Sequence, residues 1–166
     1  MNIEANVLAD VFDLTRAASL QSFQSLEKAG VDLHHVFSVE GKNLNAPFWI
    51  MAHLAVSEQF LLLQALGGPK IKLPWARMFG LGAVPPARED CPSLQEVIES
   101  LHMVHHAAME WVRGLSDEAL QEPTATGTSF GGVDQKKSLI MHAIRHEGMH
   151  AGHLGWLCKI HGLPTI

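Results

Sequence analysis

Hydrophobic side chains recur at intervals of three and four residues along several stretches of the chain, which is typical of amphipathic helices. The first stretch covers residues 3–28 and is followed by Gly30, a residue type that commonly ends a helix. We expect one long helix here, with its apolar residues packed against other helices. These residues are Ile3, Val7, Leu8, Val11, Phe12, Leu14, Ala18, Phe23 and Leu26.

The second stretch, from about Ala46 to Leu66, is apolar almost all round, which is typical of a helix surrounded by others. Asn45 is the expected N-cap, and Pro47 fits the first turn. His53 lies in the middle of this helix and is expected to be buried. A buried imidazole needs a partner, so His53 is either a core histidine bonded to a hydroxyl or carbonyl group or a metal ligand.

Two more helices are expected in the second half of the chain. The sequence SLQE at residues 93–96 is a capping box, which predicts that a helix starts there. At about 100° per residue, His105 falls on the apolar face of this helix, whereas His102 and His106 fall outside it. The last helix is expected from about Asp134 to His161, after a polar, glycine-rich loop. The four periodic stretches together predict an all-α fold, a four-helix bundle.

The connections between these helices differ in length. Residues 31–45 lack a sustained period, and we expect a loop with one helical turn, in which His34 and His35 are exposed. Residues 67–92 carry glycines and prolines but no helical or alternating pattern. A connection this long inside a compact domain is usually functional or a crossover. We expect its large side chains to cover an open end of the bundle; they are Trp75, Met78 and Phe79.

The composition favours a single globular domain, residues 1–166. Apolar residues make up 47% and charged residues 17% of the chain, with a formal charge of -5, so neither a disordered chain nor a nucleic-acid-binding surface is expected. Cys91 and Cys158 stand far apart, which predicts neither a zinc ribbon nor a disulfide framework. No basic region precedes an apolar run at the start, and no apolar stretch approaches the roughly 20 residues of a membrane span. We therefore expect a cytoplasmic protein.

Eleven histidines are the main compositional oddity. Four of them, His142, His146, His150 and His153, fall in the last predicted helix. At about 100° per residue, the other three lie within about 40° of His146, on one narrow face. Apolar residues border that face and basic residues lie opposite, so the face is expected to look inward. Because neutral imidazole is the commonest protein metal ligand, two histidines at positions i and i+4 are able to hold one ion.

A histidine pair of the last helix, together with His53 of the second, gives three convergent nitrogens. Three protein ligands leave a fourth position for water or substrate, as in catalytic zinc sites. Three roles are open for His153: a fourth ligand, a donor to one of the ligands, or a proton carrier. We rank the donor first, because a helix that already supplies two ligands rarely reaches the same ion with a third. Two roles are open for Glu147: a carboxylate that orients a ligand imidazole, or a salt bridge on the flank of the helix.

A carboxylate-bridged di-iron site is the rival interpretation. Glu99 and Glu147 each precede a histidine by three residues, which is the pattern of such bundles. Glu99, however, is expected on the solvent side of its helix, about 160° from the centre of the apolar face. The other helices would have to add inward glutamates, and Glu4 and Glu58 are poor candidates. We therefore favour the three-histidine site.

Four segments carry a resemblance to a known family: NAPFWIMAHLAVSEQFLL, WARMFG, PSLQEV and HEGMHAGHLGWL. In their order and spacing the chain resembles the DinB/YfiT-like family of metal-dependent bundles. The resemblance implies a four-helix bundle, a divalent ion held by His53, His146 and His150, and often a homodimer. Zinc or nickel is expected first, with iron and manganese as alternatives. Where the family commonly has glutamine, this chain has His153.

The leading functional hypothesis is a metal-dependent transferase that uses a small thiol, or a hydrolase that uses water, acting on an electrophilic small molecule. The resemblance implies the thiol, since characterised relatives include enzymes that use low-molecular-weight thiols. His153, His105 and Glu147 would surround the ion, and no residue is assigned as catalytic. The alternative is a non-catalytic metal- or ligand-binding dimeric bundle with a stress or sensor role. A third, purely structural hypothesis has the histidines packed without metal.

Overall fold

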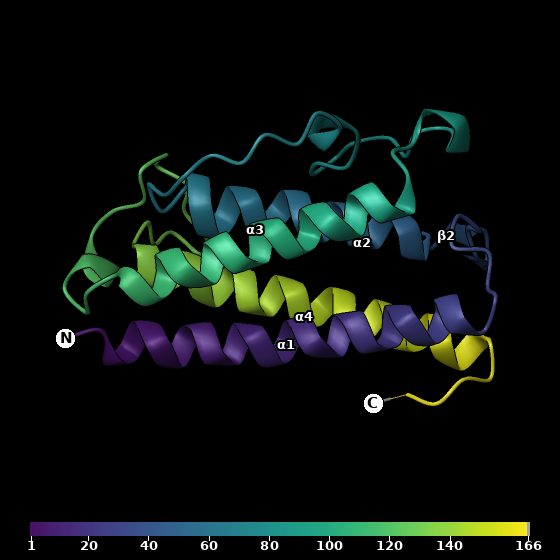
Figure 1. Ribbon diagram of the computed structural model, residues 1–166, viewed down its shortest axis with the longest axis horizontal. Coiled ribbons are helices and arrows are strands. Elements are labelled where there is room, and N and C mark those ends of the chain that lie inside the picture. The colour runs from purple at the N-terminus through teal and green to yellow at the C-terminus, as the bar shows by residue number, and fades with distance from the viewer. Residues whose placement is uncertain (166) are drawn as a thin grey trace.

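A computed structural model describes residues 1–165. Figure 1 shows α1 and α4 side by side and running in the same direction, with α2 and α3 above them running the opposite way. The expected all-α four-helix bundle is confirmed. The α-helices within residues 1–165 are α1 (Ile3–Lys28), α2 (Pro47–Glu58), α3 (Leu94–Gly114) and α4 (Lys136–Ile160).

The second helix begins one residue later than expected and changes type near its end. Ala46 occupies its N-cap without a side-chain hydrogen bond, so the prediction that Asn45 caps the helix was wrong. Pro47 stands at the first helical position, where its missing amide hydrogen costs nothing. After Glu58 the chain continues as a π-helical segment, η1 (Gln59–Gln64). Such segments are rare and frequently occur at functional sites.

The buried face of α1 differs from the predicted one. Three residues of the predicted face are buried, Phe12, Phe23 and Leu26, but small and polar side chains fill the rest of the buried face: Ala5, Ala9, Arg16, Ser19 and Ser22. Four apolar residues of the predicted face are instead exposed: Ile3, Val7, Val11 and Leu14. The cause lies in the core, where Arg16 and Ser19 bind a carboxylate of α4. These specific bonds fix the rotation of α1 against the preference of its apolar side chains.

The connection between α1 and α2 contains a small hairpin instead of the expected helical turn. Its strands, β1 (Ser38–Val39) and β2 (Lys42–Asn43), pair antiparallel. The two residues between them, Glu40 and Gly41, have φ values of 49° and 74°. Positive φ at both central residues is what a two-residue hairpin turn of type I′ requires, and glycine adopts it readily.

The connection between η1 and α3 is a crossover, as expected. It runs along α2 and returns the chain to the starting end of α2, so that α2 and α3 lie parallel (Figure 1). Two short 3₁₀ turns interrupt it, η2 (Ala76–Met78) and η3 (Arg88–Asp90). Trp75 and Phe79 are buried, and Met78 is half-buried. They pack along the side of α2, where Phe79 meets Phe48, so the prediction that they close an open end of the bundle was wrong.

In the second half of the chain α3 begins where predicted, and α4 matches both of its predicted limits within two residues. The side chain of Ser93 accepts a hydrogen bond from the backbone N–H of Glu96 at 3.1 Å, which confirms the cap of α3. A 3₁₀ turn, η4 (Ala119–Gln121), and a glycine-containing loop then lead to α4. Among the residues that the structure describes, none of the helices has the length and apolar character of a membrane span.

Candidate metal centre

Three imidazoles converge in the space between α2 and α4. His53 comes from α2, and His146 and His150 come from neighbouring turns of α4. One nitrogen of each ring lies within 4.8 Å of the others, and the Nε2 atoms of His53 and His146 are 3.1 Å apart. His53 and His150 are buried, whereas His146 is half-buried. The structure thus brings together the three residues that were predicted as ligands.

A backbone carbonyl fixes the orientation of His53. Its Nδ1 lies 2.7 Å from the carbonyl oxygen of Phe79, and because that oxygen only accepts, Nδ1 carries the hydrogen. In the neutral ring Nε2 therefore carries the lone pair, and this nitrogen faces Nε2 of His146. The ring also stacks on Trp49, with centroids 4.6 Å apart. Metal-binding histidines usually donate the N–H of their other ring nitrogen in this way. The role of Phe79 was not predicted, because no sequence pattern indicates which backbone carbonyl of an irregular connection will accept a hydrogen bond.

Burial keeps the three imidazoles neutral. It lowers the pKa of His53 below its usual value of 6.5. Burial, followed by the charge of the neighbouring histidines, lowers the pKa of His146 to about 4 and that of His150 to about 3. Near neutral pH the three rings are therefore uncharged, and each has one ring nitrogen with a lone pair, which is the form of imidazole that binds a metal ion.

The donor set fits a divalent ion. Two nitrogens at about 2.0–2.1 Å from one tetrahedral ion stand about 3.3 Å apart, close to the 3.1 Å between His53 and His146. Two unprotonated ring nitrogens at that distance repel each other unless a proton or a cation lies between them. Imidazole nitrogens suit zinc, nickel and iron. The cluster is therefore able to hold such an ion with three ligands and one open position.

Two further histidines of α4, His142 and His153, lie beside the cluster but do not belong to the group of three converging nitrogens. The ring of His142 stacks on Phe130, with centroids 3.3 Å apart, and its Nδ1 accepts a hydrogen bond from Arg145. His153 is exposed, and its Nδ1 lies 3.4 Å from Nδ1 of His150.

The remaining candidate histidines lie elsewhere. His102 and His106 are exposed on α3, as expected. His34, expected to be exposed, is half-buried and stacks on Phe48, whereas His35 is exposed.

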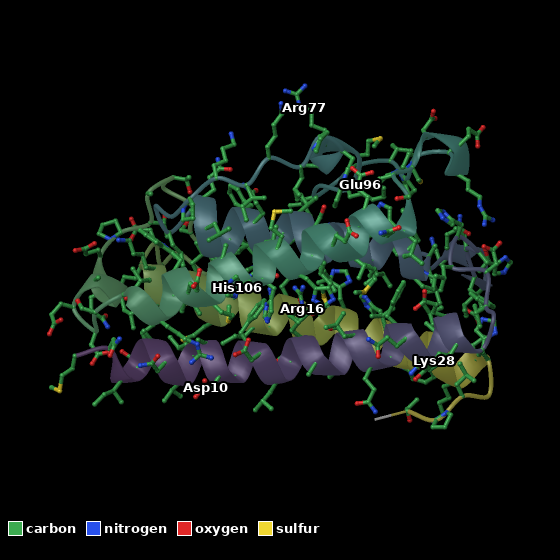
Figure 2. All side chains as sticks on the ribbon, in the orientation of Figure 1. Asp10, Arg16, Lys28, Arg77, Glu96 and His106 are labelled. Atoms are coloured by element: carbon green, nitrogen blue, oxygen red, sulfur yellow. The ribbon has the colours of Figure 1, made fainter. Side chains whose placement is uncertain are left out.

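His105 and Glu147 belong to a separate set of polar side chains, buried except for the half-buried His105, which we call the buried charge network: Arg16, Ser19, Glu58, His105 and Glu147. Arg16 binds both oxygens of Glu147 at 2.9 Å and lies 2.9 Å from an oxygen of Glu58. Ser19 donates to Glu147 at 2.6 Å, and Nδ1 of His105 lies 2.8 Å from Glu58. Figure 2 shows Arg16 in the middle of the bundle.

Two expectations for these residues were therefore wrong. Within residues 1–165 the hydrogen bonds of Glu147 go to Arg16 and Ser19 and not to a ligand imidazole, and its salt bridge lies in the core rather than on the helix flank. His105 faces Glu58 and Asp13 instead of the metal cluster. Glu147 still acts on the cluster through its charge, which partly opposes the lowering of the pKa of His53 and His146 by burial.

The network also bears on the rival di-iron interpretation. Glu58, expected to be a poor inward candidate, is buried together with Glu147. Arg16, however, binds both carboxylates. Glu99 is exposed, as expected. The cluster of metal-ligand type found among residues 1–165 contains histidines alone, so the structure does not assemble a carboxylate-bridged site there.

Two cavities open near the histidines. The first, of about 500 Å³, has His53 and His146 in its wall; its other lining residues are Val56, Ser57, Gln59, Phe60, Leu61, Gly80, Leu81, Phe130, His142 and Arg145. The second, of about 630 Å³, lies between the hairpin and the last turns of α4 and includes His153 and Trp156. Both are within the usual size of small-molecule sites. A small molecule in the first cavity reaches two of the three clustered histidines.

The comparison with known proteins agrees with this geometry. The family model described as the DinB superfamily matches residues 11–154, a range that contains all three clustered histidines. A search of curated proteins found no match. Since the family model covers most of the chain and the bundle and histidine cluster are both present, the chain belongs to the DinB superfamily.

Proposed function

We propose that the protein is a divalent-metal-dependent enzyme that activates a small thiol, or water, for attack on an electrophilic small molecule. One observation carries the proposal: three neutral imidazoles from two helices converge beside a cavity that includes His53 and His146. An ion held by three histidines acts as a Lewis acid and lowers the pKa of a bound thiol or water. Zinc or nickel is the first candidate, and iron or manganese the next.

The residues around the cluster support a site that exists before the ion arrives. The carbonyl of Phe79 holds the His53 ring in one tautomer, and Trp49 stacks on one of its faces. On the other helix, Glu147 anchors α4 to Arg16 of α1, one residue after His146. Ligands held by packing and hydrogen bonds lose little freedom when they bind, which favours tight and specific binding.

The first cavity supports a small-molecule substrate. Its walls are mainly apolar, and its polar groups lie near the clustered histidines, as in many enzyme pockets. Ser57 is one of these groups, with its hydroxyl 3.3 Å from Nε2 of His53. In the ion-free chain that hydroxyl donates to Nε2, and it would be free to donate to a molecule beside the cluster once an ion takes the Nε2 lone pair.

The test begins with metal content. Protein purified without a histidine tag should contain close to one zinc, nickel, iron or manganese ion per chain by elemental analysis, and His53→Ala should remove it. His106→Ala, which changes an exposed histidine of α3, is the matched control and should retain the metal. Unchanged metal content in His53→Ala would refute the three-ligand site.

The second step separates catalysis from simple binding. Calorimetry of the metal-loaded protein should detect binding of 2-mercaptoethanol, and a panel of electrophiles should give thiol conjugation or hydrolysis that His150→Ala abolishes. Bound metal without thiol binding or turnover would refute the enzyme proposal and favour the non-catalytic bundle. Absence of metal would favour histidines that only pack.

We also propose a homodimer, as the family resemblance implies. The support is an apolar surface on two adjacent helices: α1 exposes Ile3, Val7, Val11 and Leu14, and α4 exposes Met141, Met149 and Trp156. Contiguous exposed apolar side chains commonly mark protein interfaces. Light scattering should give twice the chain mass, and Leu14→Glu should shift it to the monomer, whereas Val84→Glu in the crossover should not. A monomeric wild-type protein would refute the dimer.

A further inference from the structure

One wall of the first cavity carries a cation without an acidic partner. Arg145 is exposed, lies next to His146 in the sequence and lines the same cavity. Among the ion pairs formed by residues 1–165, none includes Arg145, although Arg16, Arg88 and Arg113 all bind carboxylates. Its guanidinium instead donates to Nδ1 of His142 at 3.1 Å. The guanidinium therefore keeps donors free for another group.

The position of Arg145 is defined by its neighbour. His142 is held by its stack on Phe130, and it takes one N–H of Arg145. A guanidinium has five N–H donors in a planar fork that matches two carboxylate oxygens. Because one donor is engaged and the others are not, the side chain is oriented while most of its binding capacity remains.

The remaining wall of the cavity is apolar. Hydrocarbon side chains cover most of it, and they are Val56, Phe60, Leu61, Leu81 and Phe130. A ligand that fills this space must present a hydrocarbon body to these residues. The formal charge of the chain is -5, so attraction of an anion must come from local groups rather than from the protein as a whole.

We propose that this cavity binds an amphipathic carboxylate, a small molecule with a hydrocarbon body packed on the apolar wall and a carboxylate bound by Arg145. The proposal rests on the proposed function only in using the same site: it names the class of substrate whose reactive end lies beside His53 and His146. Arg145 is then a residue that determines substrate specificity.

The test compares an acid with its neutral amide. Calorimetry with 4-phenylbutyrate and 4-phenylbutyramide, on metal-free and zinc-loaded protein, should give about fivefold tighter binding of the acid, the effect of one partly exposed ion pair. Arg145→Gln should abolish the difference by weakening the acid alone, and Arg145→Lys should restore part of it. Equal affinity of acid and amide for the wild-type protein would overturn the proposal.

A matched control removes the same charge elsewhere. Arg77 is exposed on the crossover and points away from the bundle in Figure 2. Arg77→Gln should keep the preference for the acid, and loss of the preference in this variant would overturn the role of Arg145. Both arginines are exposed, so both variants should keep the helicity of the wild-type protein by circular dichroism.

A thiol pair separates this proposal from the proposed function. Zinc-loaded protein is titrated with 3-mercaptopropionate and with 3-mercaptopropionamide. If neither thiol binds while 4-phenylbutyrate is still preferred over its amide, the carboxylate site stands and thiol activation fails. If both thiols bind equally and phenylbutyrate is not preferred, thiol activation stands and the carboxylate site is overturned.

Discussion

Two buried polar regions share α4, and they are built differently. The buried charge network pairs opposite charges, since the cation of Arg16 lies 2.9 Å from the carboxylates of both Glu58 and Glu147. The histidine cluster does not, because three neutral bases face one another there. His146 and Glu147 are adjacent in the sequence, yet each belongs to a different region. A buried charge needs a counter-charge, so the network of paired charges is suited to holding helices together, whereas a cluster of uncharged imidazoles is suited to binding a cation.

The electrostatics of the two regions follow the same division. Burial lowers the pKa of Arg16, but Glu58 and Glu147 outweigh it and raise that pKa above its usual value, so the guanidinium stays charged. In the histidine cluster, burial and neighbouring histidines act together and lower the pKa values, so the rings stay neutral. The network thus contains charged groups that pair with each other, whereas the histidine cluster is uncharged until an ion binds.

The largest effect should come from removing the cation of the network. Arg16→Met leaves two buried carboxylates without a counter-charge, and it should lower the free energy of unfolding by about 3–5 kcal/mol. Urea denaturation measures the loss. Arg88→Met, which removes an exposed ion pair with Asp32, is the control and should cost less than about 1 kcal/mol. Equal effects of the two substitutions would show that the network does not stabilise the fold.

Metal binding to the histidine cluster should raise the free energy of unfolding by an amount comparable to the loss in Arg16→Met. An ion that binds the folded chain alone stabilises it by about 4 kcal/mol at a thousand times its Kd. Thermal unfolding with and without zinc should show this gain for the wild-type protein, and His150→Ala should abolish it. Glu58→Gln, a change in the network, should retain the gain in its folded form. If zinc stabilised His150→Ala as strongly as the wild-type protein, the ion would have to bind elsewhere.

Acid should weaken the metal-free protein through the cluster. The pKa values of His146 and His150 in the folded chain are about 4 and about 3, below the usual 6.5. Between these values the unfolded chain binds more protons than the folded one, so stability is full above pH 6.5 and falls as the pH drops toward 4 and 3. Unfolding free energies at pH 7 and pH 5 should differ by on the order of 1–2 kcal/mol for each of the two histidines. His150→Gln should reduce the difference, and His106→Gln should leave it unchanged.

The comparison also shows which features are readable from sequence. Helical periodicity located the four helices, and the histidines that share a face of α4 identified the cluster, because both follow from the same 3.6-residue repeat. The network was missed since its members come from α1, α2, α3 and α4, and polar residues such as Arg16 and Glu58 give no sign of being buried. The role of Phe79 was also missed, because the group that binds His53 is a backbone carbonyl, which every residue type has. The exposed apolar face of α1 was misassigned for the same reason as the network: Arg16 decides the rotation of the helix.

The smallest effect should come from replacing His153, which lies at the edge of the histidine cluster. Its Nδ1 is 3.4 Å from that of His150, longer than an ordinary hydrogen bond, and the side chain is exposed. A residue that orients a metal ligand changes metal affinity by about 10–100-fold when it is replaced. His153→Gln, which introduces the residue common at this position in the family, should change zinc affinity by less than about tenfold, because a contact this long and exposed holds His150 only weakly. Competition with a chromophoric chelator measures the affinity. A larger loss would mean that His153 orients His150, and the cluster would then extend one turn further along α4 toward the second cavity.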